Sequence, residues 1–188
     1  TIRFAATAGD SAETRGNGAT RFASAEVIDA LLLEGEERYA SSRVKVEGLY
    51  QGSAEAITNN LFWAMLYQPG HHRLYAPAGR RWIFPQAGGA PDHWTIFAWG
   101  SFFNALEASV ESARQTDDII RSVLETQYPN GNIPNWRGRS SGTPDRSQPP
   151  VGSFTVFKLF GKLGNIELLR FSYPFLKRWH SFWKAPGK

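Results

Sequence analysis

The sequence contains no cysteine and a single methionine among its 188 residues. The absence of cysteine excludes disulfide bonds, thiolate metal ligands and a cysteine nucleophile in this stretch of chain. No apolar run approaches the roughly 20 residues that a helix needs to cross a bilayer, so no membrane partner is expected. The excess of basic residues is small, 21 against 17 acidic, and both signs are scattered along the chain. This balance argues against a nucleic-acid partner, which would select a strongly basic surface.

Aromatic residues are abundant: 7 Trp, 6 Tyr and 13 Phe make up 14% of the chain. The apolar residues recur at three- and four-residue spacing, and no convincing strand run is present. Caps and proline stops predict six helices and therefore an all-α protein. The predicted helices begin, in chain order, at the N-cap Ser24, at Ser53, at Thr95, at the cap Thr116, after Pro149-Pro150 and at Asn165. The second is expected to carry Met65 on its stripe, and the fifth, apolar nearly all round, is expected to be buried on most faces.

Two linkers rich in Gly, Pro and Arg separate these helices, at 69–93 and 129–150. Loops of roughly 20 residues are uncommon inside a compact domain unless they carry function. Residues 1–20 form a poorly defined N-terminal segment rich in Ala, Thr and Gly. The length fits one domain, so residues 1–188 are interpreted as a single domain.

The second linker carries the side chains that suit a ligand covered in hydroxyl groups. Asn135 and Gln148 offer both donors and acceptors, and Arg146 offers a rigid fan of donors. Trp136 is suited to stack on the apolar face of a sugar ring. A purely structural alternative stays open, in which Asn130-Gly131 is a turn, Asp145 and Arg146 are an ordinary ion pair and the prolines only stop a helix.

Three motifs follow one another between Leu61 and Phe157. The first is Leu66-Tyr67-Gln68-Pro69 followed by Arg73, Pro77, Arg80, Arg81 and Trp82; the second is Phe97-Ala98-Trp99-Gly100-Ser101-Phe102-Phe103; the third is Ile133-Pro134-Asn135 followed by Arg146-Ser147-Gln148-Pro149-Pro150. In this order they resemble segments of trehalases and of glycoside hydrolase family 63.

The resemblance implies an (α/α)6 toroid and hydrolysis that inverts the anomeric carbon of an α-glucoside or glucosyl oligosaccharide. One carboxylic acid protonates the leaving oxygen while a second carboxylate activates water from the opposite face. No cofactor is expected. The glucosyl ring is expected to be held by residues of all three motifs and of the second linker: Arg81, Trp82, Trp99, Asn135, Trp136, Asp145, Arg146 and Gln148.

The residue after Trp99 departs from the family pattern. The resemblance implies an aspartic acid there, as the general acid, but this chain has Gly100. Asp92 and Asp145 are considered as replacement acids. The interpretation is therefore a protein that resembles an inverting α-glucosidase with a disabled acid. Two alternatives stay open: a non-catalytic carbohydrate-binding protein on the same fold, and a helical interaction module whose resemblance is accidental.

The number of predicted helices is half of what a toroid of twelve requires. The resemblance places the catalytic base beyond Lys188, so the chain is expected to form an incomplete ring. Such a half-ring would expose the inner faces of its helices, including Phe154, Phe157 and Phe160. Exposed apolar area of this kind is expected to lead to self-association or to docking with a missing half.

Other motifs have structural interpretations. His71-His72 lacks the spacing that puts two ligands on one helix face, so a solvated loop is expected rather than a metal site. Gly88-Gly89 follows no strand and lacks phosphate-loop spacing. Basic residues alternate with Trp179 and Trp183 near the C-terminus, and their helical spacing predicts an amphipathic packing helix rather than a single-strand nucleic-acid site.

Overall fold

A computed structural model describes residues 24–78, 94–138 and 141–185. The fold divides into two units, Thr1–Val44 and Lys45–Lys188. The described part of the first unit contains helix α2 (Ala25–Ser42), none of whose residues is buried. The Ser24 hydroxyl accepts a hydrogen bond from the Val27 N–H at 3.3 Å, which confirms the predicted cap. The assignment of residues 1–188 to one partial catalytic domain stays a prediction.

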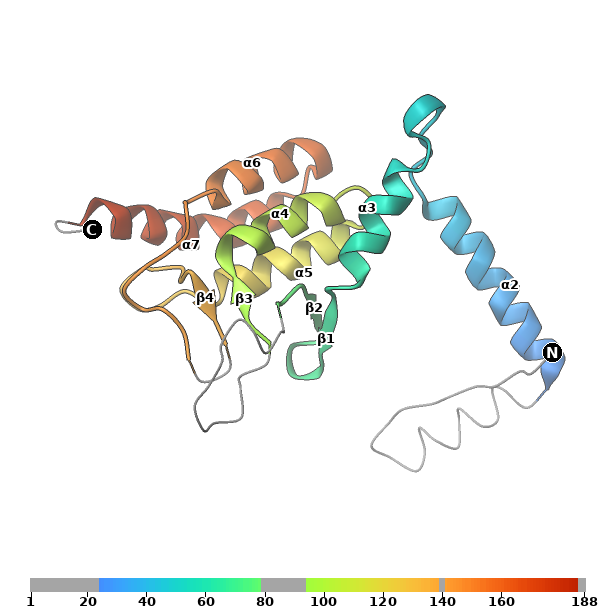
Figure 1. The fold of residues 1–188 in the computed structure, drawn as a ribbon, viewed down its shortest axis with the longest axis horizontal. Coiled ribbons are helices and arrows are strands. Elements are labelled where there is room, and N and C mark those ends of the chain that lie inside the picture. The colour runs from blue at the N-terminus through green and yellow to red at the C-terminus, as the bar shows by residue number, and fades with distance from the viewer. Residues whose placement is uncertain (1–23, 79–93, 139–140, 186–188) are drawn as a thin grey trace. The chain divides into compact units, whose positions relative to one another are not determined.

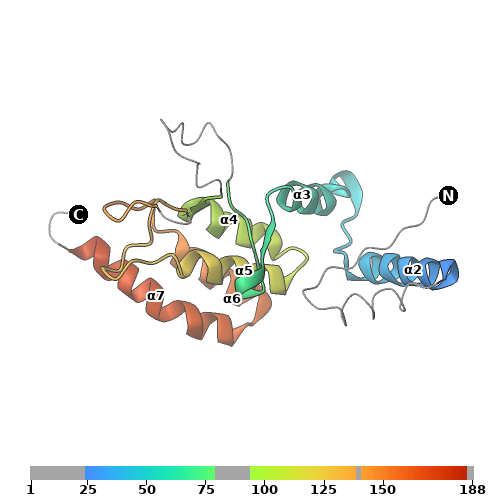
Figure 2. The same ribbon diagram turned by 90° about the horizontal axis from the view of Figure 1, so that it is seen from below.

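The second unit is mostly helical, as predicted (Figures 1 and 2). Its described residues form the helices η1 (Gly48–Tyr50), α3 (Ser53–Phe62), η2 (Pro69–His71), α4 (Ala98–Ala108), α5 (Ala113–Leu124), α6 (Gly152–Leu163) and α7 (Ile166–Lys184). Helix α4 packs against α3, α5 and α6, and α7 packs against α5 and α6. Among the described helices, none combines the length and the apolar character that crossing a membrane requires.

Two small antiparallel sheets correct the expectation that the chain has no strands. Strand β1 (Leu66–Gln68) pairs with β2 (Arg73–Tyr75), and β3 (Ile96–Phe97) pairs with β4 (Trp136–Arg137). Strand β2 lies against α5, where the Leu74 N–H donates to Asp118 Oδ2 at 3.1 Å. Strands of two or three residues are too short to show an alternating pattern, so the sequence did not reveal them.

The core lies between α4, α5, α6 and α7. Phe102 of α4 and Trp179 of α7 are fully buried and stack at 5.8 Å, and Ile120, Leu124 and Leu159 pack around them. Gly152, the first residue of α6, touches this pair so closely that an added Cβ would meet Phe102, Leu176 and Trp179 at 2.8 to 2.9 Å. The absence of a side chain at this position therefore lets α6 approach α4 and α7.

Several predicted helix boundaries are wrong. Helix α3 ends at Phe62, so Met65 lies outside it. Helix α4 begins at Ala98 because Thr95 pairs with Ala78 in a β-bridge. Helix α5 begins at Ala113, because Ser112 rather than Thr116 provides the cap and accepts from the Gln115 N–H at 3.2 Å.

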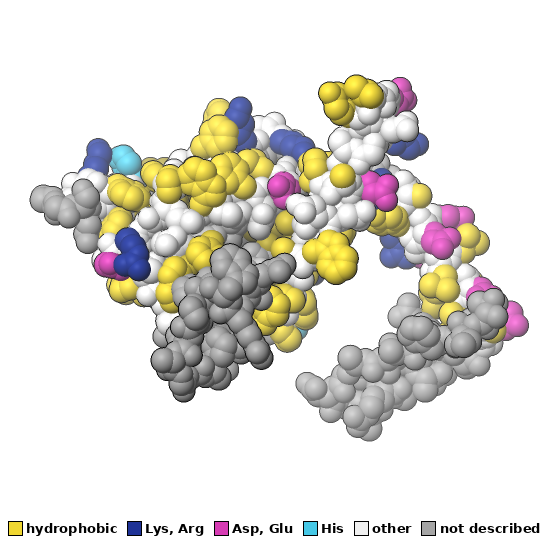
Figure 3. Space-filling model, in the orientation of Figure 1, with side chains coloured by type: hydrophobic (Ala, Val, Ile, Leu, Met, Phe, Trp, Pro, Cys, Tyr) yellow, Lys and Arg dark blue, Asp and Glu magenta, His cyan; other side chains and the backbone are white. Residues whose placement is uncertain are grey.

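The start of α7 agrees with the prediction, since Asn165 Oδ1 accepts from the Leu168 N–H at 3.0 Å. Helix α6 begins two residues after Pro150, also as predicted. Its expected burial on most faces is wrong, because Phe154, Phe157 and Phe160 are exposed. Figure 3 shows hydrophobic side chains on the visible surface where α6 lies, beside basic ones.

Candidate functional site

The loop 129–150 lies against the first turn of α4 and joins two of the sequence motifs. The Ala98 N–H donates to the Asn135 carbonyl oxygen at 3.2 Å, and the Asn135 N–H donates to the Arg146 carbonyl oxygen at 3.1 Å. The Trp99 N–H donates to Gln148 Oε1 at 2.6 Å. These bonds bring Trp99, Asn135, Arg146 and Gln148 together at the start of α4.

Gln148 has a clear structural role in this arrangement. The N-cap residue of α4, Phe97, provides no side-chain hydrogen bond to the first turn. The first N–H groups of a helix lack partners within the helix, and a side chain from elsewhere can satisfy them. Gln148 does so for the Trp99 N–H through its amide oxygen.

Asn132 organises the loop from inside. Its side chain is fully buried, and its Nδ2 donates to the carbonyl oxygens of Thr143, Pro144 and Arg146 at 3.0 to 3.2 Å. Its N–H donates to Asn130 Oδ1 at 3.0 Å, which closes the turn around Gly131, where φ is +88°. Asn132 was not among the predicted site residues, although an amide between Pro129 and Pro134 was a signal for such a role.

Ser147 ties the same loop to the core. Its hydroxyl donates to the Ile133 carbonyl oxygen and accepts from Trp179 Nε1 at 3.1 Å. Trp179 is buried, so the indole N–H finds here the partner that burial requires. Ser147 lies within the third motif but was not named as a functional residue, and its contacts are those of a structural residue.

Two tryptophans flank the junction between loop and helix. Trp136 lies in β4 directly opposite Phe97 of β3, and its carbonyl oxygen accepts from the Thr143 N–H at 3.2 Å. Its side chain is partly buried. Trp99 is 39% exposed and contacts Phe103 edge to face at 5.2 Å. Trp99 therefore offers an accessible indole surface at the start of α4.

Asp145 and Arg146 form an ion pair at 2.9 Å, and both side chains are 63% exposed. An exposed pair of this kind contributes only about 0–1 kcal/mol to stability. The ordinary ion pair of the structural alternative is thus present. The backbone of residue 146 is held by Asn132 and Asn135, whereas its guanidinium group extends into solvent, where a ligand can reach it.

Gly100 lies in the first turn of α4, and an added Cβ would meet no atom within 4 Å. The position of the expected acid therefore has room for a larger side chain. Arg81 and Trp82, also predicted to bind substrate, lie outside the described residues, as does Asp92. Within the described ranges, no three His, Asp or Glu side chains gather as metal ligands would.

Comparison with family models, with curated proteins and with solved structures finds no match to this chain.

Proposed function

We propose that the chain carries part of the substrate site of a glycoside hydrolase similar to the inverting α-glucosidases, on helices that belong to an (α/α)6 toroid. The substrate is an α-glucoside or a glucosyl oligosaccharide. The observation that supports this proposal is the pair of contacts from the third motif to the first turn of α4, through Asn135 and Gln148. Two segments recognised by resemblance, separate in sequence, thereby meet at the start of α4.

The chemistry of this surface suits a sugar ring. The Trp99 indole offers an apolar face for the ring carbons, and the Arg146 guanidinium and Gln148 amide offer donors for the hydroxyl oxygens. Trp136 and Asp145 of the second linker, together with Arg81 and Trp82 of the first motif, complete the proposed subsite. Asp145 also positions Arg146, because its carboxylate pairs with the exposed guanidinium group.

Inverting hydrolysis needs an acid and a base on opposite faces of the sugar, with carboxyl groups roughly 6.5 to 9.5 Å apart. In the proposed mechanism the acid belongs at residue 100, at the positive end of α4, and none of the described residues is assigned as the base. Gly100 carries no proton to donate. In this proposal Trp99, Arg146 and Gln148 bind the glucosyl ring, and a carboxyl group at residue 100 would protonate the leaving oxygen.

Titration with sugars tests the proposal. Glucose, trehalose, kojibiose, nigerose and maltose are added to the chain while tryptophan fluorescence is followed, and saturable quenching is expected. Arg146→Ala should weaken binding about tenfold or more, because a hydrogen bond to a charged donor contributes about 1.5–3 kcal/mol. Arg170→Ala is the matched control, since Arg170 is also exposed and paired with a neighbouring carboxylate, Glu167 at 2.6 Å.

Equal effects of the two arginine substitutions would overturn the assignment of Arg146. A flat response to every sugar, from a chain whose circular dichroism shows that it is folded, would contradict binding by this chain and favour a helical interaction module.

Gly100 favours a second candidate, a carbohydrate-binding protein that has lost its chemistry. Both candidates predict sugar binding, so binding alone does not separate them. Gly100→Asp does, when it is introduced into a chain that also supplies the base. Hydrolysis of glucosides that appears with Gly100→Asp supports an enzyme with a disabled acid, whereas binding without hydrolysis supports the non-catalytic protein.

A further inference from the structure

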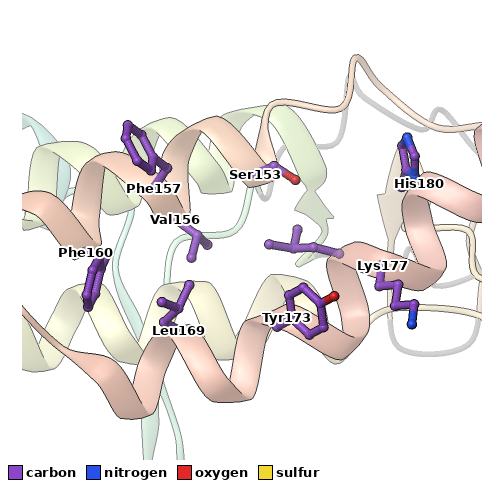
Figure 4. A pocket seen from close by; sticks show the side chains of 9 residues that line it. Ser153, Val156, Phe157, Phe160, Leu169, Tyr173, Lys177 and His180 are labelled. Atoms are coloured by element: carbon purple, nitrogen blue, oxygen red, sulfur yellow. The ribbon is translucent and has the colours of Figure 1, made fainter.

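Helices α6 and α7 enclose a groove on the surface of the second unit (Figure 4). Its volume is about 370 Å³. We call it the α6–α7 groove, and it is lined by Ser153, Val156, Phe157, Phe160, Leu169, Tyr173, Leu176, Lys177 and His180. In Figure 4 the phenylalanines lie towards one end, and Lys177 and His180 lie towards the other. The groove therefore has an apolar end and a basic end.

The lining residues recur at helical spacing. On α6 they follow Ser153 by three, four and seven positions, and on α7 they follow Leu169 by four, seven, eight and eleven. Residues at these intervals share one face of a helix. Each helix thus presents a whole face to the groove, and a groove between two helix faces is the shape into which a third helix packs.

The apolar part of the groove is accessible. Phe157 is 70% exposed, Phe160 is partly exposed, and Tyr173 is 63% exposed. Single exposed apolar residues are ordinary, but several on one groove indicate a surface that binds another molecule.

The charges on α6 and α7 indicate the chemical character of the partner. Helices α6 and α7 together carry one acidic residue, Glu167, against six basic ones: Lys158, Lys162, Arg170, Lys177, Arg178 and Lys184. Glu167 is paired with Arg170. Within the described part of the chain no carboxylate lies within ion-pair distance of Lys177. The basic end of the groove therefore complements an acidic partner, and opposite charges across an interface favour association and select the partner.

We propose that the α6–α7 groove is the docking site of an acidic amphipathic helix. Its apolar face covers Phe157, Phe160 and Leu169, and its carboxylates meet Lys177 at the basic end. The groove spans about three helical turns along α7, so a partner helix of similar length fills it. Pairing of this face with the same face of a second copy would bring like charges together, which disfavours self-association. The proposal does not depend on sugar binding.

The test measures binding of labelled peptides to the full 188-residue chain by fluorescence anisotropy. The probe is a helical peptide of about 14 residues, roughly 21 Å long, with leucines on one face and glutamates on the other. One matched peptide has lysine in place of glutamate. A second has the composition of the probe in an order that breaks up the leucine face. Saturable binding of the acidic amphipathic peptide alone is expected.

Substitutions on the protein test the location. Phe157→Ala and Lys177→Glu should each weaken binding at least about tenfold, because both residues line the groove. Both side chains are exposed, so neither substitution is expected to disturb the fold. Phe154→Ala and Lys184→Glu are the matched controls, since both lie on the same helices but outside the lining of the groove. They should leave binding unchanged.

Three results would overturn the proposal: no binding of the acidic peptide, equal binding of the three peptides, or equal effects of the groove and control variants. Sedimentation velocity tests whether a second copy of the chain occupies the groove instead. A concentration-dependent dimer that Phe157→Ala dissociates would assign the groove to a second copy of the chain and would also overturn the proposal.

Discussion

Two glycines near the starts of helices have opposite surroundings. Gly100 of α4 has open space where a Cβ would lie, whereas Gly152 of α6 rests on Phe102, Leu176 and Trp179. Gly100 destabilises α4, because glycine loses more backbone entropy on folding than other residues do. At Gly152 the packing of α6 leaves no room for a side chain.

Alanine substitution at each position should therefore change stability in opposite directions. Gly100→Ala should raise the free energy of unfolding by about 0.5–1 kcal/mol, because alanine loses less backbone entropy in a helix. Gly152→Ala should lower it by about 1–3 kcal/mol, because the added methyl group overfills the core. Urea unfolding followed by circular dichroism measures both. A stable Gly152→Ala variant would mean that α6 can move away from the stacked pair of rings.

At the scale of the element, helix α2 has an ionisable residue, Glu26, in its first turn. The pKa of the Glu26 carboxyl is lowered from its ordinary value of 4.5, first by its own backbone N–H and then by the Ser24 hydroxyl. A carboxylate at a helix N-terminus is also favoured by the helix dipole.

Because the folded pKa is the lower one, Glu26 stabilises α2 above its unfolded pKa, and this contribution is lost as the pH falls through the folded pKa. An NMR titration of the Glu26 side chain should give a pKa below 4.5. Ser24→Ala should move it upward, and the helical signals of α2 should weaken in acid less steeply in Glu26→Gln than in the native chain. A Glu26 pKa at or above the ordinary value would contradict this prediction.

Helix starts were predictable where the cap is local. Ser24 and Asn165 precede their helices and bond to N–H groups three residues on, a relation visible in the sequence. The start of α4 was not predictable, because Thr95 pairs with Ala78 and because the first-turn partner, Gln148, lies far away in the chain. Thr116 resembled a cap but is buried in α5, where its hydroxyl donates to the Ser112 carbonyl oxygen at 2.8 Å.

In the candidate site, too, contacts between residues distant in the chain could not be predicted from the sequence. Asn135, Arg146 and Gln148 were named from their residue types and from a resemblance, and the loop does bring their backbones to the start of α4. The buried supports, Asn132 and Ser147, were missed, because their roles depend on carbonyl groups and an indole that only the folded loop brings within reach.

At the scale of the whole molecule, the chain divides between Val44 and Lys45. The described helix of the first unit buries none of its residues, whereas the second unit contains the core around Phe102 and Trp179. A chain of residues 45–188 should therefore unfold at the same temperature as the full chain and keep the same response to sugars. Differential scanning calorimetry of the two chains measures this. A large loss of thermal stability on removal of residues 1–44 would contradict the independence of the second unit.

The hydrogen bond from Trp99 to Gln148 joins residues 49 positions apart. A helix whose first turn depends on so distant a side chain cannot complete its own beginning early in folding, because closing a long loop is entropically costly and slow. Opening of the loop should in turn fray α4, so that amide hydrogens of both segments exchange with solvent in one event. A molecule that held the loop closed would then slow exchange along a helix that it touches only at the start.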